Sequence, residues 1–118
     1  MQNIEIQSFA GNTSSYQGTV VIIDVFRAFS VAAYAFENGA KEILMLDDLD
    51  QARELRNKGV GSYCMGERGG DKPDDFDFGN SPQEIKDMDF SEHTLIQTTS
   101  NGTRGLVSAE NASKLYAA

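Results

Sequence analysis

The strongest constraint on this chain is a regular alternation of short apolar runs with stretches of helical character. The run Thr19–Ile23 is β-branched and apolar on both faces, which is typical of a central parallel strand. Weaker or shorter strands are predicted over residues 3–9, 42–46, 63–65, 94–98 and 114–118. Strands that alternate with helices predict an α/β fold, in which helices pack on a mostly parallel sheet.

The helices are predicted from apolar patterning and from their end signals. One covers residues 31–36 and stops at Asn38-Gly39, and the next is capped by Asp47 or Asp48 and stops at Gly59. A capping box with proline in its first turn, Ser81-Pro82-Gln83-Glu84, predicts a short third helix. A fourth is predicted over residues 103–109. We expect one α/β domain over residues 1–118.

Composition narrows the class of protein. Hydrophobic residues make up 40% of the 118 residues and charged residues 24%, as in ordinary soluble proteins. No apolar run approaches the roughly 18 residues of a membrane span, and the N-terminus lacks signal-peptide features. The single cysteine, Cys64, excludes an internal disulfide, so we expect the protein to reside in a reducing cytoplasm.

The distribution of charge argues against binding of nucleic acid and favours binding of a small anion. The net charge of −8 argues against general binding of nucleic acids or anionic membranes, which need a basic face. Three of the five arginines, however, lie in three loops that each follow a predicted strand: Arg27, Arg68 and Arg104. Because ligands in such folds bind beyond the carboxyl ends of the strands, we expect the three loops to meet at one rim.

The acidic residues of these loops are candidate metal ligands. Asp24 directly follows a strand and is expected to act as Mg²⁺ ligand, base or nucleophile; the alternative is a helix cap or a partner for Arg27. Glu67 and Arg68 stand between glycines. Glu67 is interpreted as a metal ligand, and Arg68 beside it as a guanidinium that binds an anion; the alternative is an ordinary ion pair in a surface loop. Asp77 and Asn80 add oxygen donors of the kind that hard cations accept.

The third loop, Thr98–Arg104, combines hydroxyls, a glycine and an arginine at the start of a predicted helix. Backbone N–H groups at such a start attract anions, and glycine lets the backbone approach closely. The alternative is a common helix start capped by Asn101 or Thr103.

Taken together, these segments resemble the 2-phosphosulfolactate phosphatase family. The matching stretches occur in the family's order: 21–28, 38–42, 66–70, 76–82 and 98–104. The resemblance extends over nearly the whole chain. The resemblance implies a Mg²⁺-dependent acid phosphatase that releases phosphate from 2-phosphosulfolactate, leaving 3-sulfolactate on the route to coenzyme M. The partner implied is thus a small anionic phosphate ester.

The loops and the resemblance together assign the candidate residues. The catalytic residues are expected to be Asp24, Glu67 and Arg68, and the Mg²⁺ ligands Asp24, Glu67 and Asp77. Substrate binding is assigned to Arg27, Asn80, Ser81, Thr98, Thr99, Asn101, Gly102, Thr103 and Arg104.

Two residues and the length depart from the family pattern. Phe29 stands where a hydroxyl residue is usual, and Ser100 where threonine is usual. Family members are about twice as long, so we expect the chain to correspond to their N-terminal half. Apolar surface would then be left uncovered, and we expect self-association, poor solubility or low activity as a consequence. The alternative function is a truncated, catalytically inactive module that binds anions.

Overall fold

The structure, a computed structural model, describes residues 3–8 and 12–118. Five strands and four helices alternate along this part of the chain: β1 (Gly18–Ile22), α1 (Ala28–Glu37), β2 (Glu42–Leu46), α2 (Leu49–Asn57), β3 (Tyr63–Gly66), α3 (Pro82–Ile85), β4 (Thr94–Thr98), α4 (Gly102–Ser108) and β5 (Ala112–Ala117). All strand pairs between these elements are parallel, which confirms the predicted α/β fold.

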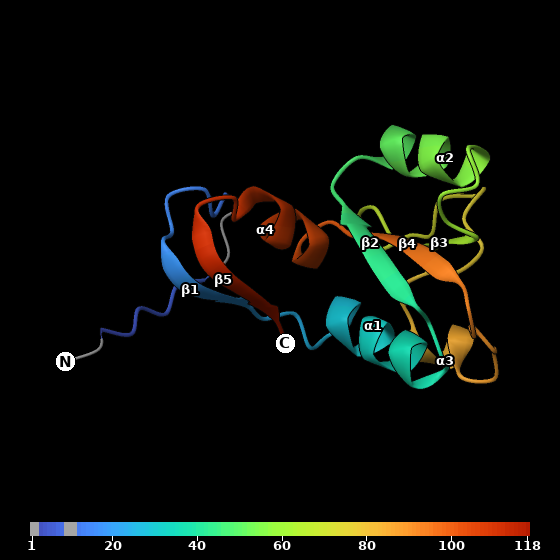
Figure 1. Cartoon of the computed structure of the whole chain (residues 1–118), viewed down its shortest axis with the longest axis horizontal. Coiled ribbons are helices and arrows are strands. Elements are labelled where there is room, and N and C mark those ends of the chain that lie inside the picture. The colour runs from blue at the N-terminus through green and yellow to red at the C-terminus, as the bar shows by residue number, and fades with distance from the viewer. Residues whose placement is uncertain (1–2, 9–11) are drawn as a thin grey trace.

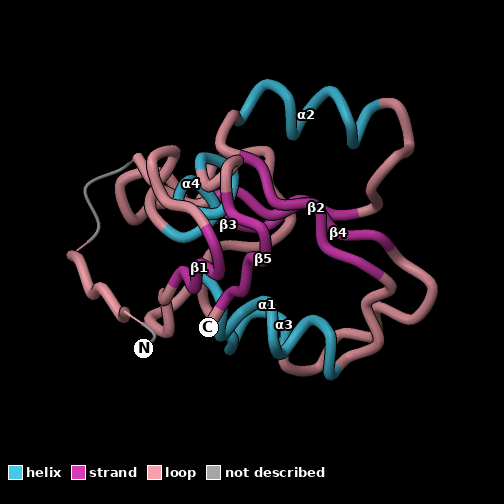
Figure 2. The backbone as a smooth tube through the Cα atoms, turned by 60° about the vertical axis from the view of Figure 1, so that its left-hand side comes forward, coloured by secondary structure: helices cyan, strands magenta, loops and turns pink. Residues whose placement is uncertain are grey.

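Three of the strands form one sheet in the order β2-β4-β3. Helices α1 and α3 lie on one face of this sheet and α2 lies on the other, so the sheet is the middle of three layers (Figures 1 and 2). Because β4 is the central strand, its side chains are covered on both faces, and all of its residues after Thr94 are buried, the polar Gln97 and Thr98 included.

The core around the three-stranded sheet consists of two apolar clusters, one on each face of the sheet. Leu95 packs on the α1 side with Val31, Met65, Ile85 and Phe90, all fully buried. Its neighbour Ile96 points to the α2 side and joins a cluster of buried residues: Ala52, Cys64 and Phe76. The alternation of Leu95 and Ile96 between the clusters is the two-residue period of a strand.

The other two strands, β1 and β5, form a separate two-stranded sheet. The register places Val21 opposite Tyr116 and Val20 opposite Leu115. Helix α4 contacts this small sheet and links it to β4 (Figure 1). The strands of the predicted fold therefore divide between two parallel sheets.

Several end signals work as the sequence predicts. Asp48 caps α2, since its carboxylate accepts hydrogen bonds from the N–H groups of Asp50 (2.7 Å) and Gln51 (3.1 Å). Helix α1 stops at Asn38, and Gly39 adopts a φ of +96°, a conformation that favours glycine.

Two local predictions differ from the structure. Residues 3–8 form no strand, because they pair with no described strand and leave Ile4 and Ile6 exposed; Phe9, the end of that predicted strand, lies outside the described residues. The capping box is also incomplete: the Ser81 side chain caps nothing, and Glu84 instead accepts a hydrogen bond from the Gly79 N–H (3.0 Å). In residues 3–8 and 12–118, the helices are too short or too polar to span a bilayer.

Candidate anion site

The turn between β4 and α4 is held by its own threonines. Thr99 Oγ1 accepts a hydrogen bond from Thr103 N–H (3.1 Å), and Thr103 Oγ1 accepts one from Thr99 N–H (2.7 Å). Both side chains are buried. This reciprocal pair replaces the predicted cap, since Asn101 makes no side-chain cap bond. The two hydroxyls thus fix the shape of the turn that was expected to bind substrate.

Glu67 ties the loop after β3 to the same turn. Its carboxylate accepts hydrogen bonds from the Ser100 N–H (2.7 Å), the Ser100 hydroxyl (2.8 Å) and the Gly70 N–H (2.9 Å). Burial raises the pKa of Glu67, but these hydrogen bonds outweigh it and hold the pKa below its ordinary value. The buried, ionised Glu67 therefore acts here as a clamp between two loops.

Arg68 is anchored to two strand ends. Its guanidinium donates to the carbonyls of Glu67 (3.0 Å) and Asp47 (2.7 Å) and to Thr98 Oγ1 (2.6 Å). These bonds occupy three of its five N–H groups, and both hydrogens of one terminal nitrogen. Arg68 is thus a fixed positive charge at the carboxyl end of the three-stranded sheet.

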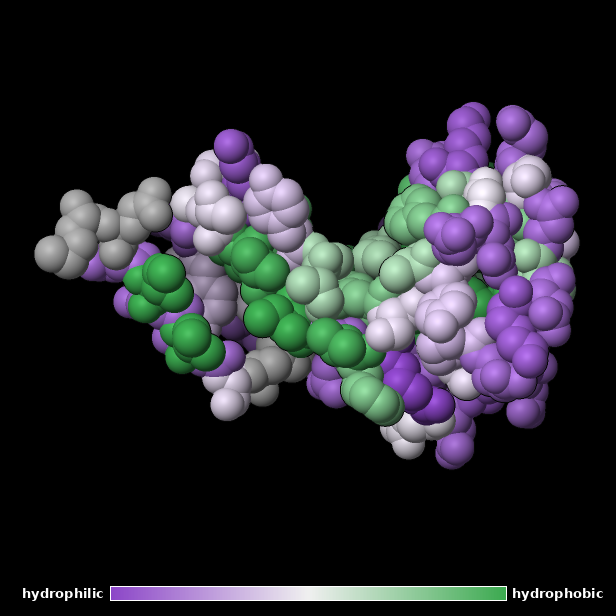
Figure 3. All heavy atoms as spheres, turned by 90° about the horizontal axis from the view of Figure 1, so that it is seen from below, coloured by the Kyte–Doolittle hydropathy of each residue, from purple (hydrophilic) through white to green (hydrophobic). Residues whose placement is uncertain are grey.

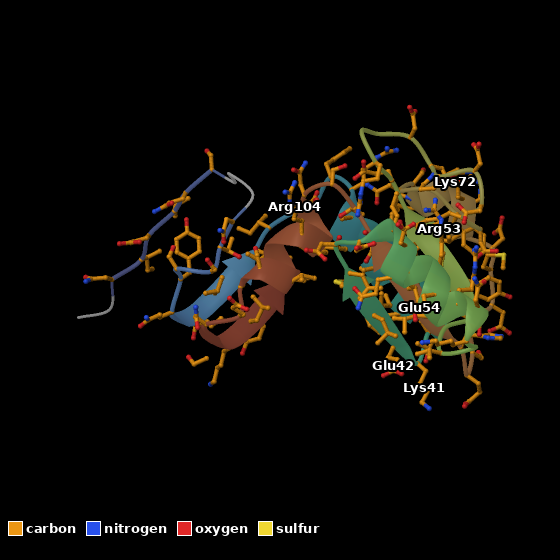
Figure 4. The ribbon with its side chains drawn as sticks, turned by 90° about the horizontal axis from the view of Figure 1, so that it is seen from above. Lys41, Glu42, Arg53, Glu54, Lys72 and Arg104 are labelled. Atoms are coloured by element: carbon orange, nitrogen blue, oxygen red, sulfur yellow. The ribbon has the colours of Figure 1, made fainter. Side chains whose placement is uncertain are left out.

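Arg104 supplies a second positive charge beside it. A pocket of about 330 Å³ is lined by Asp47, Arg68, Thr99, Ser100 and Arg104. Within the described part of the chain, no hydrogen bond or ion pair engages the Arg104 guanidinium, which projects from α4 apart from the other labelled residues (Figure 4). Its planar fork is therefore available to an anion in the pocket.

Asp24 reaches this region from the small sheet. A Cβ added at Gly102 would lie 2.8 Å from Asp24 Oδ2 and 3.0 Å from the Ala28 Cβ, so a larger residue at the start of α4 would force these side chains to shift. Across residues 3–8 and 12–118, no hydrogen bond or ion pair engages the Asp24 carboxylate. The loops after β1 and β3 therefore both contact the segment after β4, although Asp24 is not among the residues that line the pocket at Arg104.

A larger hollow of about 430 Å³ is also lined by Arg68, together with Arg53, Lys72 and several acidic residues. Its Arg53 is already bonded to Asp75 (2.8 Å) and Asp50 (3.0 Å), and Lys72 donates to the carbonyls of Pro73 and Phe76. Because these cations have partners, this hollow is a poorer anion site than the pocket at Arg104.

Other predicted site residues lie elsewhere or serve the fold. Asp77 accepts hydrogen bonds from the Cys64 N–H (2.8 Å) and from Arg56 (3.3 Å), at the α2 side of the molecule. Ser81 stands at the start of α3, and the exposed Arg27 at the start of α1. None of these three lines the pocket at Arg104.

The predicted Mg²⁺ ligands do not form one set. Both Glu67 oxygens are held by protein donors, and Asp77 is held at Cys64. In the described ranges, 3–8 and 12–118, no three of His, Cys, Asp and Glu cluster in a way that could hold a metal ion. Mg²⁺ often binds through one or two carboxylates together with water and substrate phosphate, so Asp24 is the one predicted ligand of the three that stays available for it.

Two residues at this junction were missed. Asp47 directly follows β2, and the strand-end position that singled out Asp24 also identifies it, yet it was considered only as a helix cap. Gln97 is fully buried in β4 and donates to the Ala28 carbonyl (2.8 Å). Its Oε1, like Asn80 Oδ1, is buried without a partner among the described atoms. No local sequence signal marks Gln97.

Comparison with known proteins identifies the relatives of the chain. The family model described as 2-phosphosulpholactate phosphatase matches residues 7–118. A probable 2-phosphosulfolactate phosphatase of Caldicellulosiruptor saccharolyticus is 40% identical over 96 residues, covering 81% of this chain and 40% of the relative. The corresponding protein of Bacillus subtilis is 40% identical over 96 residues, covering 81% of the chain and 42% of the relative.

A third relative, from Thermotoga petrophila and carrying the same name, is 41% identical over 86 residues, or 73% of this chain and 37% of its own length. The chain thus spans about two fifths of the length of the curated relatives it matches. The chain belongs to the 2-phosphosulpholactate phosphatase family.

Proposed function

We propose that this chain carries the anion-binding part of a phosphatase that hydrolyses a small phosphate monoester. The observation that carries the proposal is the pocket in which Arg68 and Arg104 face the turn at Thr99 and Ser100. Two guanidinium groups in an otherwise acidic protein form a local positive site for a phosphate. The relatives' name suggests 2-phosphosulfolactate as the ester and 3-sulfolactate as the product.

The two arginines have different tasks in this proposal. Arg68 supplies charge from a fixed position, because protein acceptors take most of its donors. Arg104, whose donors have no partner among the described residues, grips the phosphate through its fork. Glu67 acts through Ser100: it holds the turn so that Ser100 and Thr99 line the pocket in one geometry.

Asp24 is the proposed catalytic carboxylate. It lies against Gly102, and its carboxylate is free of hydrogen bonds and ion pairs from the described residues, so it can act as nucleophile, base or metal ligand. We propose Mg²⁺ as the cofactor, which Asp24 would help to hold. Such an ion would polarise the phosphate. The coenzyme M route and a cytoplasmic location belong to the same proposal.

The test is Mg²⁺-dependent hydrolysis of p-nitrophenyl phosphate by the wild type, Asp24→Asn and Asp87→Asn. Asp87 is exposed and serves as the matched control. We expect hydrolysis by the wild type and the control, and a loss of at least about 100-fold in Asp24→Asn. Equal rates in both variants contradict the role of Asp24.

Two observations favour the second candidate, an anion-binding module without turnover. The chain spans about two fifths of its relatives, and the predicted metal ligands do not assemble in it. Phosphate binding measured by calorimetry, without hydrolysis by the wild type under any Mg²⁺ concentration, would establish this second function and reject the first.

A further inference from the structure

The small sheet leaves one apolar face open. Among the large hydrophobic side chains with high exposure are Val21 at 49%, Ile23 at 72% and Tyr116 at 54%. Val25 and Phe26 follow directly in the chain and are also exposed. Figure 3 shows hydrophobic side chains gathered in a band on the side seen from below. Scattered apolar residues are normal on a surface, but a contiguous group marks an interaction site.

The register shows that Val21, Ile23 and Tyr116 share one face of the sheet. Val21 lies opposite Tyr116 in the parallel pair, and Ile23 follows Val21 by one strand period. The pairing continues past β1, because the Asp24 N–H donates to the Ala118 carbonyl (2.7 Å). Val20 points the other way and is only 8% exposed. We call the face formed by Val21, Ile23 and Tyr116 the outer face.

An open face of this kind is unusual for parallel strands. Parallel sheets are almost always covered on both faces, and two strands alone are too few for independent stability. The three-stranded sheet of the same chain follows this rule, with helices on each side (Figure 2). The outer face of the small sheet therefore lacks a layer that this class of sheet normally has.

The relatives indicate what supplies that layer. The family model matches residues 7–118, which include β1 and β5, so the small sheet belongs to the shared part of the family. The curated relatives are matched over only 37–42% of their own lengths. We propose that the outer face docks against the part of the family's polypeptide beyond the matched stretch, through an apolar layer that covers Val21, Ile23 and Tyr116.

A second copy of this chain is a less favourable partner for the outer face. The chain carries a net charge of −8, so two copies repel each other electrostatically as they approach. The proposal concerns docking alone and stands apart from the proposed phosphatase activity.

The experiment measures how fast an introduced cysteine reacts with a thiol reagent, because a covered thiol reacts more slowly than an exposed one. The one native cysteine, Cys64, is fully buried, and burial raises its pKa, so it reacts slowly. Tyr116→Cys reports on the outer face, and Gln51→Cys on exposed α2 is the control. Each substitution is made in two proteins: this chain, and an extended chain in which the unmatched part of the Bacillus subtilis relative is joined after Ala118.

We expect the thiol of Tyr116→Cys to react at least tenfold more slowly in the extended chain than in this chain, while Gln51→Cys reacts equally in both. Equal rates for Tyr116→Cys in the two chains overturn the proposal. Protection that grows with the concentration of this chain alone also overturns it, because the occupant is then a second copy. If Tyr116→Cys does not fold, judged by circular dichroism, Val21→Cys decides by the same criteria.

Discussion

The two sheets of this protein use similar strands but stand in different surroundings. In the sheet β2-β4-β3, helices cover both faces, and residues such as Leu95 and Ile96 are fully buried. In the sheet β1-β5, only Val20 is a buried strand residue, and Leu115 and Tyr116 stay partly exposed. The candidate site lies where these two regions meet. Its rigid side, with Glu67 and Arg68, comes from the buried sheet, and its Asp24 comes from the exposed one.

The largest expected difference separates two leucines in the two sheets. Leu95→Ala removes a fully buried side chain and should lower the free energy of unfolding by about 2–5 kcal/mol. Leu115→Ala removes a side chain that is 39% exposed, so we expect a loss of about 1 kcal/mol or less. Urea denaturation of both variants measures this. Equal losses would show that the small sheet is as firmly packed as the large one.

A smaller effect is expected at the clamp between the loops. Glu67→Gln replaces a carboxylate that accepts three hydrogen bonds with an amide that has one oxygen, so we expect a loss of about 1–3 kcal/mol and weaker phosphate binding. Glu54→Gln, on the surface of α2, is the matched control and should change neither quantity. Thermal unfolding and phosphate titration test both. If Glu67→Gln keeps wild-type phosphate affinity, the clamp does not shape the pocket.

The pH dependence of stability follows from the same carboxylate. The pKa of Glu67 is lower in the folded protein than in the unfolded chain, so its ionised form stabilises the fold. This contribution is complete above the unfolded pKa and disappears as pH falls through the folded pKa. Between neutral pH and acid, the wild type should therefore lose stability more steeply than Glu67→Gln. Parallel stability curves from pH 7 to pH 3 would contradict this account.

The smallest expected effect compares two arginines. Arg104→Lys keeps the positive charge but loses the planar fork, so phosphate affinity should fall by roughly tenfold. Arg53→Lys changes an exposed arginine that already pairs with Asp50 and Asp75, and should leave phosphate affinity unchanged. Calorimetric titration with inorganic phosphate distinguishes the two. An affinity that falls equally in both variants would mean that phosphate responds to overall charge and not to the pocket.

The fold was predictable from the sequence as far as local signals reach. β-branched and apolar runs identified β1, β2, β3 and β4, and Asp48 and Gly39 marked helix ends. The division into two sheets was not predictable, because it depends on which strands pair, and strands of similar composition can pair in several orders. The segment at residues 3–8 shows the same limit: its weak alternation suits a strand, but no described strand pairs with it.

The candidate site was predictable in outline but not in detail. Strand-end positions predicted that the loops at Asp24, Arg68 and Gly102 lie together; in the structure Asp24 lies against Gly102 and Arg68 bonds to Thr98, while the roles of these residues in a site stay predictions. The roles of single side chains depend on hydrogen-bond partners distant in the sequence: Glu67 bonds to Ser100, and Asp77 bonds to Cys64. Because these partners are set by packing, residue type alone suggested metal ligands where the structure shows loop contacts.

The central claim is that a phosphate binds where the two regions meet, between Arg68 and Arg104. The most direct measurement is an NMR titration of the ¹⁵N-labelled protein with inorganic phosphate, following the backbone amides. The account predicts that the largest shifts occur at Thr99, Ser100 and Arg104, with little change at Arg53 and in β5. Shifts centred on Arg53 and Lys72, or no saturable shifts, would contradict it.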